Sequence, residues 1–249
     1  MMHDLSLAAA AVIGAAFLFA GTVKGTIGAG LPFASIPIVA LVVEPVTAVS
    51  LTIVPVILTN LVQSLHGGHY RDVLKRFWLF LACLVAGVIV GAQLLATADP
   101  GTTKIILGGV VASVSLLQLF GGGFSVPVAV QRWLTPVVGL ASGLFGGLAG
   151  MMVPAVIYTA ALRLPKDLLI SLFALIALSG TLPLYATLFV NGALRLPELT
   201  VSALAMIPAV VGLFLGTWIR GRISQRLFER LLFSGLFILG LSLVYKGLA

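Results

Sequence analysis

Charged residues and cysteine are both scarce in this sequence. Only 8% of its 249 residues are Asp, Glu, Lys or Arg, compared with about 25% in a typical soluble domain. The single cysteine, Cys83, has no partner for a disulfide or a thiolate metal site, and three histidines are too few to predict a metal centre. We therefore expect neither a metal nor a cofactor.

Acidic residues are absent from the interior of the apolar runs, and several enzyme motifs are absent altogether. All seven Asp and Glu residues fall at the ends of runs or in loops, so no carboxylate proton relay is visible in the core. The sequence contains no Walker A motif, no G-x-S-x-G and no H-E-x-x-H. We therefore expect that the protein is not an enzyme and does not hydrolyse ATP.

Apolar residues make up 60% of the chain, and the mean hydropathy is +1.21. This composition predicts an integral membrane protein with room for roughly eight to ten helical segments of about 20 residues each. The net charge of +7 is typical of the cytoplasmic loops of such proteins. We therefore expect the lipid bilayer as the surroundings of the chain and no nucleic-acid partner.

Ten apolar runs follow one another along the chain, five in each half. They lack the alternating pattern of a barrel, and backbone polar groups must be paired inside hydrocarbon, so the predicted fold class is all-α. The first run follows Asp4 and no basic residue, which favours a retained membrane segment over a signal peptide. The runs cover residues 5–23, 25–43, 45–65, 74–96, 103–122, 133–150, 151–163, 166–190, 199–219 and 228–247.

The distribution of Lys and Arg predicts the orientation of these segments. If the runs alternate across the membrane, eleven basic residues gather on one side and three on the other, and the richer side is cytoplasmic. Both termini are then outside the cell. The richer side holds Lys24, Arg71, Lys75, Arg76, Arg132, Arg163, Lys166, Arg220, Arg222, Arg226 and Arg230, and the poorer side holds Lys104, Arg195 and Lys246.

The same count predicts two repeats of opposite orientation, because the first five runs begin outside and the second five begin inside. Inverted repeats of this kind are common in secondary transporters. The spacing of Gly25-x-x-Gly28 recurs at Gly143-x-x-Gly146, which supports a duplication. We assign residues 1–122 to the first membrane repeat, 123–132 to a cytoplasmic linker and 133–249 to the second, inverted repeat.

Glycine and proline interrupt the first pair of runs in each repeat. The stretch GTIGAGLP follows Lys24, and GLFGGLAGMMVP occupies residues 143–154. Residues 133–163 are too few for two full crossings, which need about 40 residues, so we expect each pair to be broken or re-entrant near the midplane. The two tips would then present helix N-termini to a shared cavity, where backbone N–H groups bind anions.

These stretches supply the first group of candidate binding residues. The alternative for each glycine is close helix packing, and Lys24 is either a snorkelling side chain at the cytoplasmic face or a buried cation that needs an anion. The group comprises Lys24, Gly25, Thr26, Gly28, Ala29, Gly30, Ser142, Gly143, Gly146, Gly147 and Gly150.

Polar residues inside other runs form a second group of candidates, for which interhelical hydrogen bonding is the alternative. Asn60 and Gln63 lie one turn apart, and Ser179, Thr181 and Tyr185 occupy the corresponding region of the second half. His66 and His69 are the candidates for proton coupling, because histidine titrates near neutral pH; the alternative is that they are solvated loop residues.

The two interrupted stretches, GTIGAGLPFASIPIVALVVEP and GLFGGLAGMMVPAVIYTAALRLP, resemble the TauE/SafE family of sulfite and sulfonate exporters over nearly the whole chain. The resemblance implies a secondary transporter of small sulfur-containing anions, such as sulfite or sulfoacetate, in the bacterial cytoplasmic (inner) membrane. It also implies use of the proton gradient, and the two inverted repeats predict alternating access as the mechanism. A passive anion channel and a structural membrane subunit are the alternatives, and a bundle of this size is compatible with a homodimer.

Overall fold

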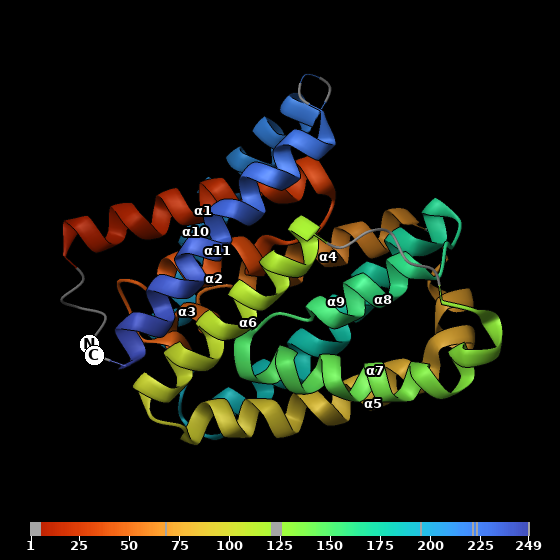
Figure 1. Ribbon diagram of the computed structural model, residues 1–249. Coiled ribbons are helices and arrows are strands. Elements are labelled where there is room, and N and C mark those ends of the chain that lie inside the picture. Colours follow the sequence, from red (N-terminus) through yellow and green to blue (C-terminus); the bar gives the residue numbers. More distant parts are fainter. Residues whose placement is uncertain are drawn as a thin grey trace. The chain divides into compact units, whose positions relative to one another are not determined.

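The computed structural model describes residues 6–67, 69–120, 126–194, 196–220, 222 and 224–248, and within them it is all-α, with no strand (Figure 1). Side chains are described for these residues except 65–67, 128, 160, 166, 196, 225 and 226. The helices are α1 (Leu7–Ile27), α2 (Leu31–Val39), α3 (Pro45–Ser50), α4 (Ile53–Gly67), α5 (Tyr70–Thr97), α6 (Pro100–Phe120), α7 (Val128–Ala149), α8 (Val153–Ala161), α9 (Lys166–Val190), α10 (Leu196–Arg220) and α11 (Gln225–Leu248).

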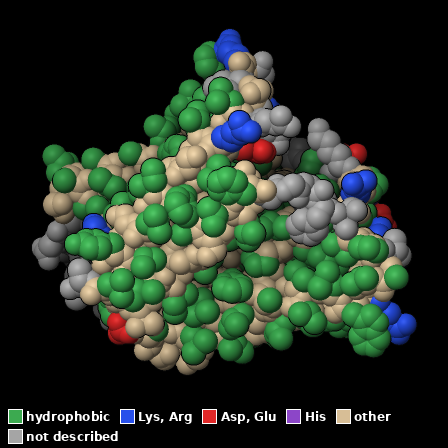
Figure 2. Space-filling model, in the orientation of Figure 1, with side chains coloured by type: hydrophobic (Ala, Val, Ile, Leu, Met, Phe, Trp, Pro, Cys, Tyr) green, Lys and Arg blue, Asp and Glu red, His purple; other side chains and the backbone are tan. Residues whose placement is uncertain are grey.

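Seven helical segments in the described chain are long and apolar enough to cross a membrane. Large apolar side chains such as Trp78, Phe214 and Leu231 are exposed on them, as expected where a helix meets lipid rather than water. Hydrophobic side chains also dominate the face drawn in Figure 2. The protein is therefore a multi-pass membrane protein.

Helix lengths recur in the two halves of the sequence. The 21-residue α1 is followed by the nine-residue α2, and the 22-residue α7 is followed by the nine-residue α8. The chain leaves helical geometry at Gly28–Gly30 in the first pair and at Gly150–Met152 in the second. A break therefore falls in each of the two Gly/Pro stretches, whereas their depth in the bilayer stays a prediction.

The predicted run 45–65 is not one helix, because it is divided between α3 and α4 at Leu51 and Thr52. The hydroxyl of Ser202, on α10, donates to the Leu51 carbonyl at 2.7 Å and accepts from the Val54 N–H at 3.0 Å. One side chain thus satisfies two backbone groups that the interruption leaves without helical partners. Sequence pattern could not predict this division, since Ser202 is distant along the chain.

The chain folds into two compact units, and each draws on both halves of the sequence. The first comprises Met1–Pro55, Ala98–Gly121 and Gly192–Ala249, and the second comprises Val56–Thr97 and Gly122–Asn191. The first unit therefore contains α1, α2, α3, α6, α10 and α11, and the second contains α5, α7, α8, α9 and most of α4. The proposed repeat boundaries at 122 and 133 stay a prediction about the sequence.

Close glycine contacts fix the direction of the main helix pair in the first unit. A Cβ on Gly21 would meet the backbone of Ala209, and one on Gly25 would meet the backbone of Leu213. Because both sets of residue numbers rise together, α1 and α10 are parallel. Their C-terminal ends, Ile27 and Arg220, therefore lie together.

The second unit contains an equivalent parallel pair. A Cβ on Gly143 of α7 would meet the backbone of Leu84 on α5, and one on Gly147 would meet that of Val88. In the predicted repeat α7 corresponds to α1, and α10 corresponds to α5, because Gly87-x-x-x-Gly91 recurs as Gly212-x-x-x-Gly216. The α1–α10 and α7–α5 pairs would then be reciprocal. Both pairs depend on small residues, which let two backbones approach closely.

Helices α6 and α11, the last of each half, lie side by side in the first unit (Figure 1). A Cβ on Gly101 would meet the backbone of Gly247, and one on Gly108 would meet the backbone of Gly240. One set of residue numbers falls as the other rises, so the two helices are antiparallel. The start of α6 is capped by Asp99, and hydrogen bonds from the side chain and backbone of Thr102 hold the pKa of its carboxyl below the usual value.

Candidate functional site

The break between α1 and α2 is built from two glycines in the left-handed region. Gly28 has φ +90° and closes α1 with a hydrogen bond from its N–H to the Lys24 carbonyl, 2.7 Å long. Gly30 has φ +95° and is the N-cap of α2. Side chains other than glycine adopt such angles at a cost, so the sequence GAG permits this turn.

Lys24 lies in the last turn of α1, directly before the break. Its side chain is only 6% exposed. Among the residues whose side chains the structure describes, no other Lys, Arg, Asp or Glu is buried. Of the two alternatives for Lys24, the structure therefore favours the buried cation over a side chain extended into water.

The first helical turn of α2 follows the break, opposite the last turn of α1 that holds Lys24. The Gly30 carbonyl accepts from the Ala34 N–H at 3.0 Å, so the helix proper begins at Leu31. Pro32 lies in the first turn and contributes no N–H, which leaves the N–H groups of Leu31 and Phe33 at the helix end. A helix N-terminus carries partial positive charge, so Lys24 and α2 contribute potential of the same sign here.

The neighbouring candidates Gly25 and Thr26 contact α10. A Cβ on Gly25 would meet the backbone of Leu213. The Thr26 hydroxyl donates to the carbonyl of Thr22 at 2.8 Å and to that of Gly216 at 3.2 Å. Both residues therefore have a packing role, the alternative that the sequence left open, while Gly28, Ala29 and Gly30 form the break itself.

The break in the second unit has a different lining. Gly150, at φ +69°, closes α7 through a hydrogen bond to the Gly146 carbonyl. A Cβ on Gly146 would come within 2.6 Å of the Met152 side chain, and one on Gly180 would also overlap it. The thioether side chain of Met152 thus fills the space that these two glycines leave, and no buried Lys or Arg among the described side chains corresponds to Lys24 there.

Other candidates from the first group are distributed around α7. Gly143 and Gly147 pack on α5, as described above. Ser142 is fully buried, and its hydroxyl has no hydrogen-bond partner in the part of the chain that the structure describes. Ser171, on α9 of the same unit, shares this property.

The second group of candidates also lies in the second unit. Asn60 is buried and donates from its side-chain amide to the Val56 carbonyl at 2.8 Å. Thr181 and Tyr185 are buried on α9, whereas Gln63 and Ser179 are half-buried. Asn60 therefore has at least one structural hydrogen bond, and a binding role for these five residues stays a prediction.

Of the two histidines proposed for proton coupling, His66 lies in the last turn of α4 and His69 directly precedes α5. Nδ1 of His69 lies 3.4 Å from a carboxylate oxygen of Asp72, and both side chains are exposed. This is the arrangement expected for a solvated loop histidine. The side chain of His66 lies outside the described residues.

A family model for the sulfite exporter TauE/SafE matches residues 13–243. The match covers both helix breaks and every helix at least in part. The chain belongs to the TauE/SafE family. No curated protein and no solved structure gives a significant match.

Membership in the TauE/SafE family makes this chain a membrane transporter of the sulfite exporter type rather than an enzyme. The sequence predicted Lys24 and the first break as parts of the site but not Arg220, which served there only to predict orientation. Nη2 of Arg220 lies 4.0 Å from the position that a Cβ on Gly28 would occupy. The parallel packing of α1 and α10 produces this proximity, and no local motif signals it.

Proposed function

We propose that this protein is a secondary transporter that moves small sulfur-containing anions, either sulfite or organosulfonates such as sulfoacetate, across the bacterial cytoplasmic membrane. Family membership supports the transporter class. The observation that carries the anionic substrate is the burial of Lys24 in the last turn of α1, beside the Gly28–Gly30 break.

The chemistry of the substrate explains why a buried cation is needed. A sulfonate is a strong acid and stays ionised at cellular pH, so it cannot enter a dry site by taking up a proton. Moving an isolated anion out of water is costly unless positive charge and hydrogen-bond donors replace the water. Lys24 supplies the charge, and the N–H groups at the start of α2 supply donors and a favourable helix dipole.

Alternating access between inverted repeats is the proposed mechanism. Helices α6 and α11, which end the two halves, are antiparallel, as inversion requires. The recurring pairs of a long helix and a nine-residue helix, and the reciprocal packing of α1 with α10 and α5 with α7, also support inversion. If a proton moves with the anion, His66 and His69 are the candidate carriers on the cytoplasmic side in the proposed orientation, because histidine titrates near neutral pH.

Replacing Lys24 tests this function directly. We expect Lys24→Met, which keeps the length of the side chain but removes its charge, to lower saturable uptake of ³⁵S-sulfite into proteoliposomes roughly a hundredfold or more, because an uncompensated buried anion costs several kcal/mol. Unlabelled sulfoacetate should compete with sulfite in the wild type. Thermal unfolding in detergent checks that the variant is folded.

The matched control is Lys104→Met, which removes a less buried cation from α6 in the same unit. It should transport like the wild type. Folded Lys24→Met protein with full activity would reject the proposed site. Uptake by the wild type that never saturates would indicate a channel instead, and absence of any sulfite or sulfonate uptake would favour a structural subunit.

A further inference from the structure

A second cation lies at the first helix break, and it comes from α10. Because α1 and α10 are parallel, the last turn of α10 lies at the level of the break. Arg220 occupies that turn, with Nη2 4.0 Å from the position that a Cβ on Gly28 would take. The guanidinium of Arg220 therefore lies close to the backbone of the break at Gly28.

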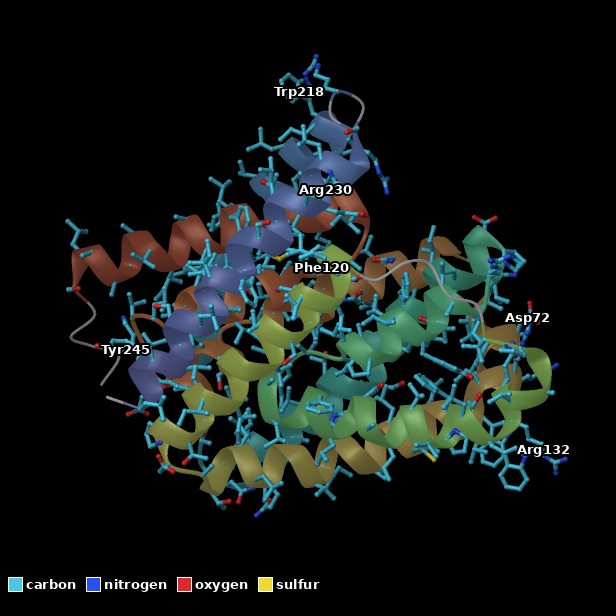
Figure 3. All side chains as sticks on the ribbon, viewed as in Figure 1. Asp72, Phe120, Arg132, Trp218, Arg230 and Tyr245 are labelled. Atoms are coloured by element: carbon cyan, nitrogen blue, oxygen red, sulfur yellow. The ribbon has the colours of Figure 1, made fainter. Side chains whose placement is uncertain are left out.

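The guanidinium of Arg220 is available for a ligand. Its side chain is exposed, and the described residues provide it with neither a carboxylate nor a hydrogen-bond acceptor. Arg222, two residues further on, is engaged differently, since its guanidinium carbon lies 3.4 Å from the centroid of the Trp218 ring. Figure 3 shows Trp218 at this end of the first unit, at the opposite end from Tyr245.

We propose that Arg220 is a specificity-determining residue that captures the substrate at the exposed side of the break, before the anion reaches Lys24. This inference rests on the proposed function and deepens it. A planar guanidinium donates two parallel hydrogen bonds to two oxygens on one atom, a geometry that sulfite and sulfonate groups offer and a halide does not. Arg220 therefore selects oxyanions, while buried Lys24 compensates their charge.

Chemical labelling tests the contact without depending on transport. The purified full-length protein in detergent is treated with phenylglyoxal, which modifies accessible arginines, and the modified sites are mapped by peptide mass spectrometry. Sulfoacetate is the protecting anion, because sulfite itself adds to dicarbonyl reagents. We expect sulfoacetate to slow modification of Arg220 several-fold, and chloride at equal ionic strength to have a much smaller effect. Modification of Arg222, the internal reference, should not change with either anion.

Transport kinetics provide the second measurement. Arg220→Gln should raise the KM for sulfite about tenfold, the size of effect expected from one charge-assisted hydrogen bond, with little change in the maximal rate. Arg220→Lys keeps the positive charge but loses the pair of parallel hydrogen bonds that selects an oxyanion. Chloride should therefore inhibit sulfite transport by this variant more strongly than transport by the wild type. The matched control Arg222→Gln should keep the wild-type KM.

The outcomes separate this inference from the proposed function. Suppose that the wild type transports sulfite. If sulfoacetate then fails to protect Arg220 from modification, or if Arg220→Gln keeps the wild-type KM, the role of Arg220 is overturned and the proposed function is not. Protection of Arg220 in a wild type that does not transport supports an anion site there and overturns the transport function. If the wild type neither binds nor transports these anions, both proposals are wrong.

Discussion

Single polar side chains carry unusually clear roles in this apolar protein, because few other groups can replace them. Ser202 joins two interrupted backbone segments through its hydroxyl, whereas the equally buried hydroxyl of Ser115 has no partner among the described residues. The two serines therefore differ in energetic role although both are fully buried in the first unit. Burial alone does not reveal this difference.

Alanine substitutions should separate these two serines. Ser202→Ala leaves the Val54 N–H and the Leu51 carbonyl without their side-chain partner, so we expect a loss of about 1–3 kcal/mol in the free energy of unfolding. Ser115→Ala removes a buried, unpaired hydroxyl and should be neutral or slightly stabilising. Denaturant unfolding in detergent measures both. Equal destabilisation by the two substitutions would contradict the assigned hydrogen bonds.

At the scale of the helices, glycine has two separate uses. Gly28, Gly30 and Gly150 take left-handed angles that end or begin helices. Gly21 and Gly143 instead lie inside helices, where a side chain would overlap the backbone of a neighbouring helix. The first use sets where the chain breaks, and the second sets which helices pack together.

Two glycines of α1 allow a matched test of the packing role. Gly21→Ala should separate α1 from α10 and lower the free energy of unfolding by about 1–3 kcal/mol, because its Cβ overlaps the backbone of Ala209. Gly14→Ala has open space around its Cβ and should be neutral or gain up to about 1 kcal/mol from helix propensity. Thermal unfolding of both variants under the same detergent conditions compares them. If Gly21→Ala were as stable as Gly14→Ala, the close helix contact would be wrong.

At the scale of the whole molecule, the basic residues predict that the α10–α11 turn is cytoplasmic and the C-terminus is outside. Figure 3 places Arg230 and Tyr245 toward opposite ends of α11, and both side chains are exposed. Fifteen residues of helix separate them, which corresponds to about 22 Å along the axis. They are therefore positions nearer the two membrane faces that the basic residues predict for α11.

Cysteine accessibility checks this orientation. In a Cys83→Ser background, Tyr245→Cys should react with a membrane-impermeant maleimide in intact spheroplasts, and Arg230→Cys should react only after permeabilisation, because the positive-inside rule places the Arg-rich end in the cytoplasm. The reverse pattern would invert the predicted topology. Reaction of both residues from one side would mean that α11 does not cross the membrane.

Much of the candidate site could be predicted from sequence, although not the partners of its residues. The breaks fall within GTIGAGLP and GLFGGLAGMMVP because glycine and proline act on the local backbone. The packing of Gly25 and Gly143, the filling of the second break by Met152, and the approach of Arg220 to Gly28 all involve residues from different helices. A sequence pattern records the residue but not its neighbour.

The order of the amino acids by itself determined that this is a helical membrane protein, that breaks fall in the two Gly/Pro stretches, and that one lysine lies directly before the first of these breaks. These properties depend on hydropathy and backbone preference, which act over a few adjacent residues. Tertiary packing decided that Lys24 is buried, that α1 runs parallel to α10, and that Arg220 lies beside Gly28. Such features depend on contacts through space between distant segments, because helices of similar hydropathy can pack in many alternative pairs.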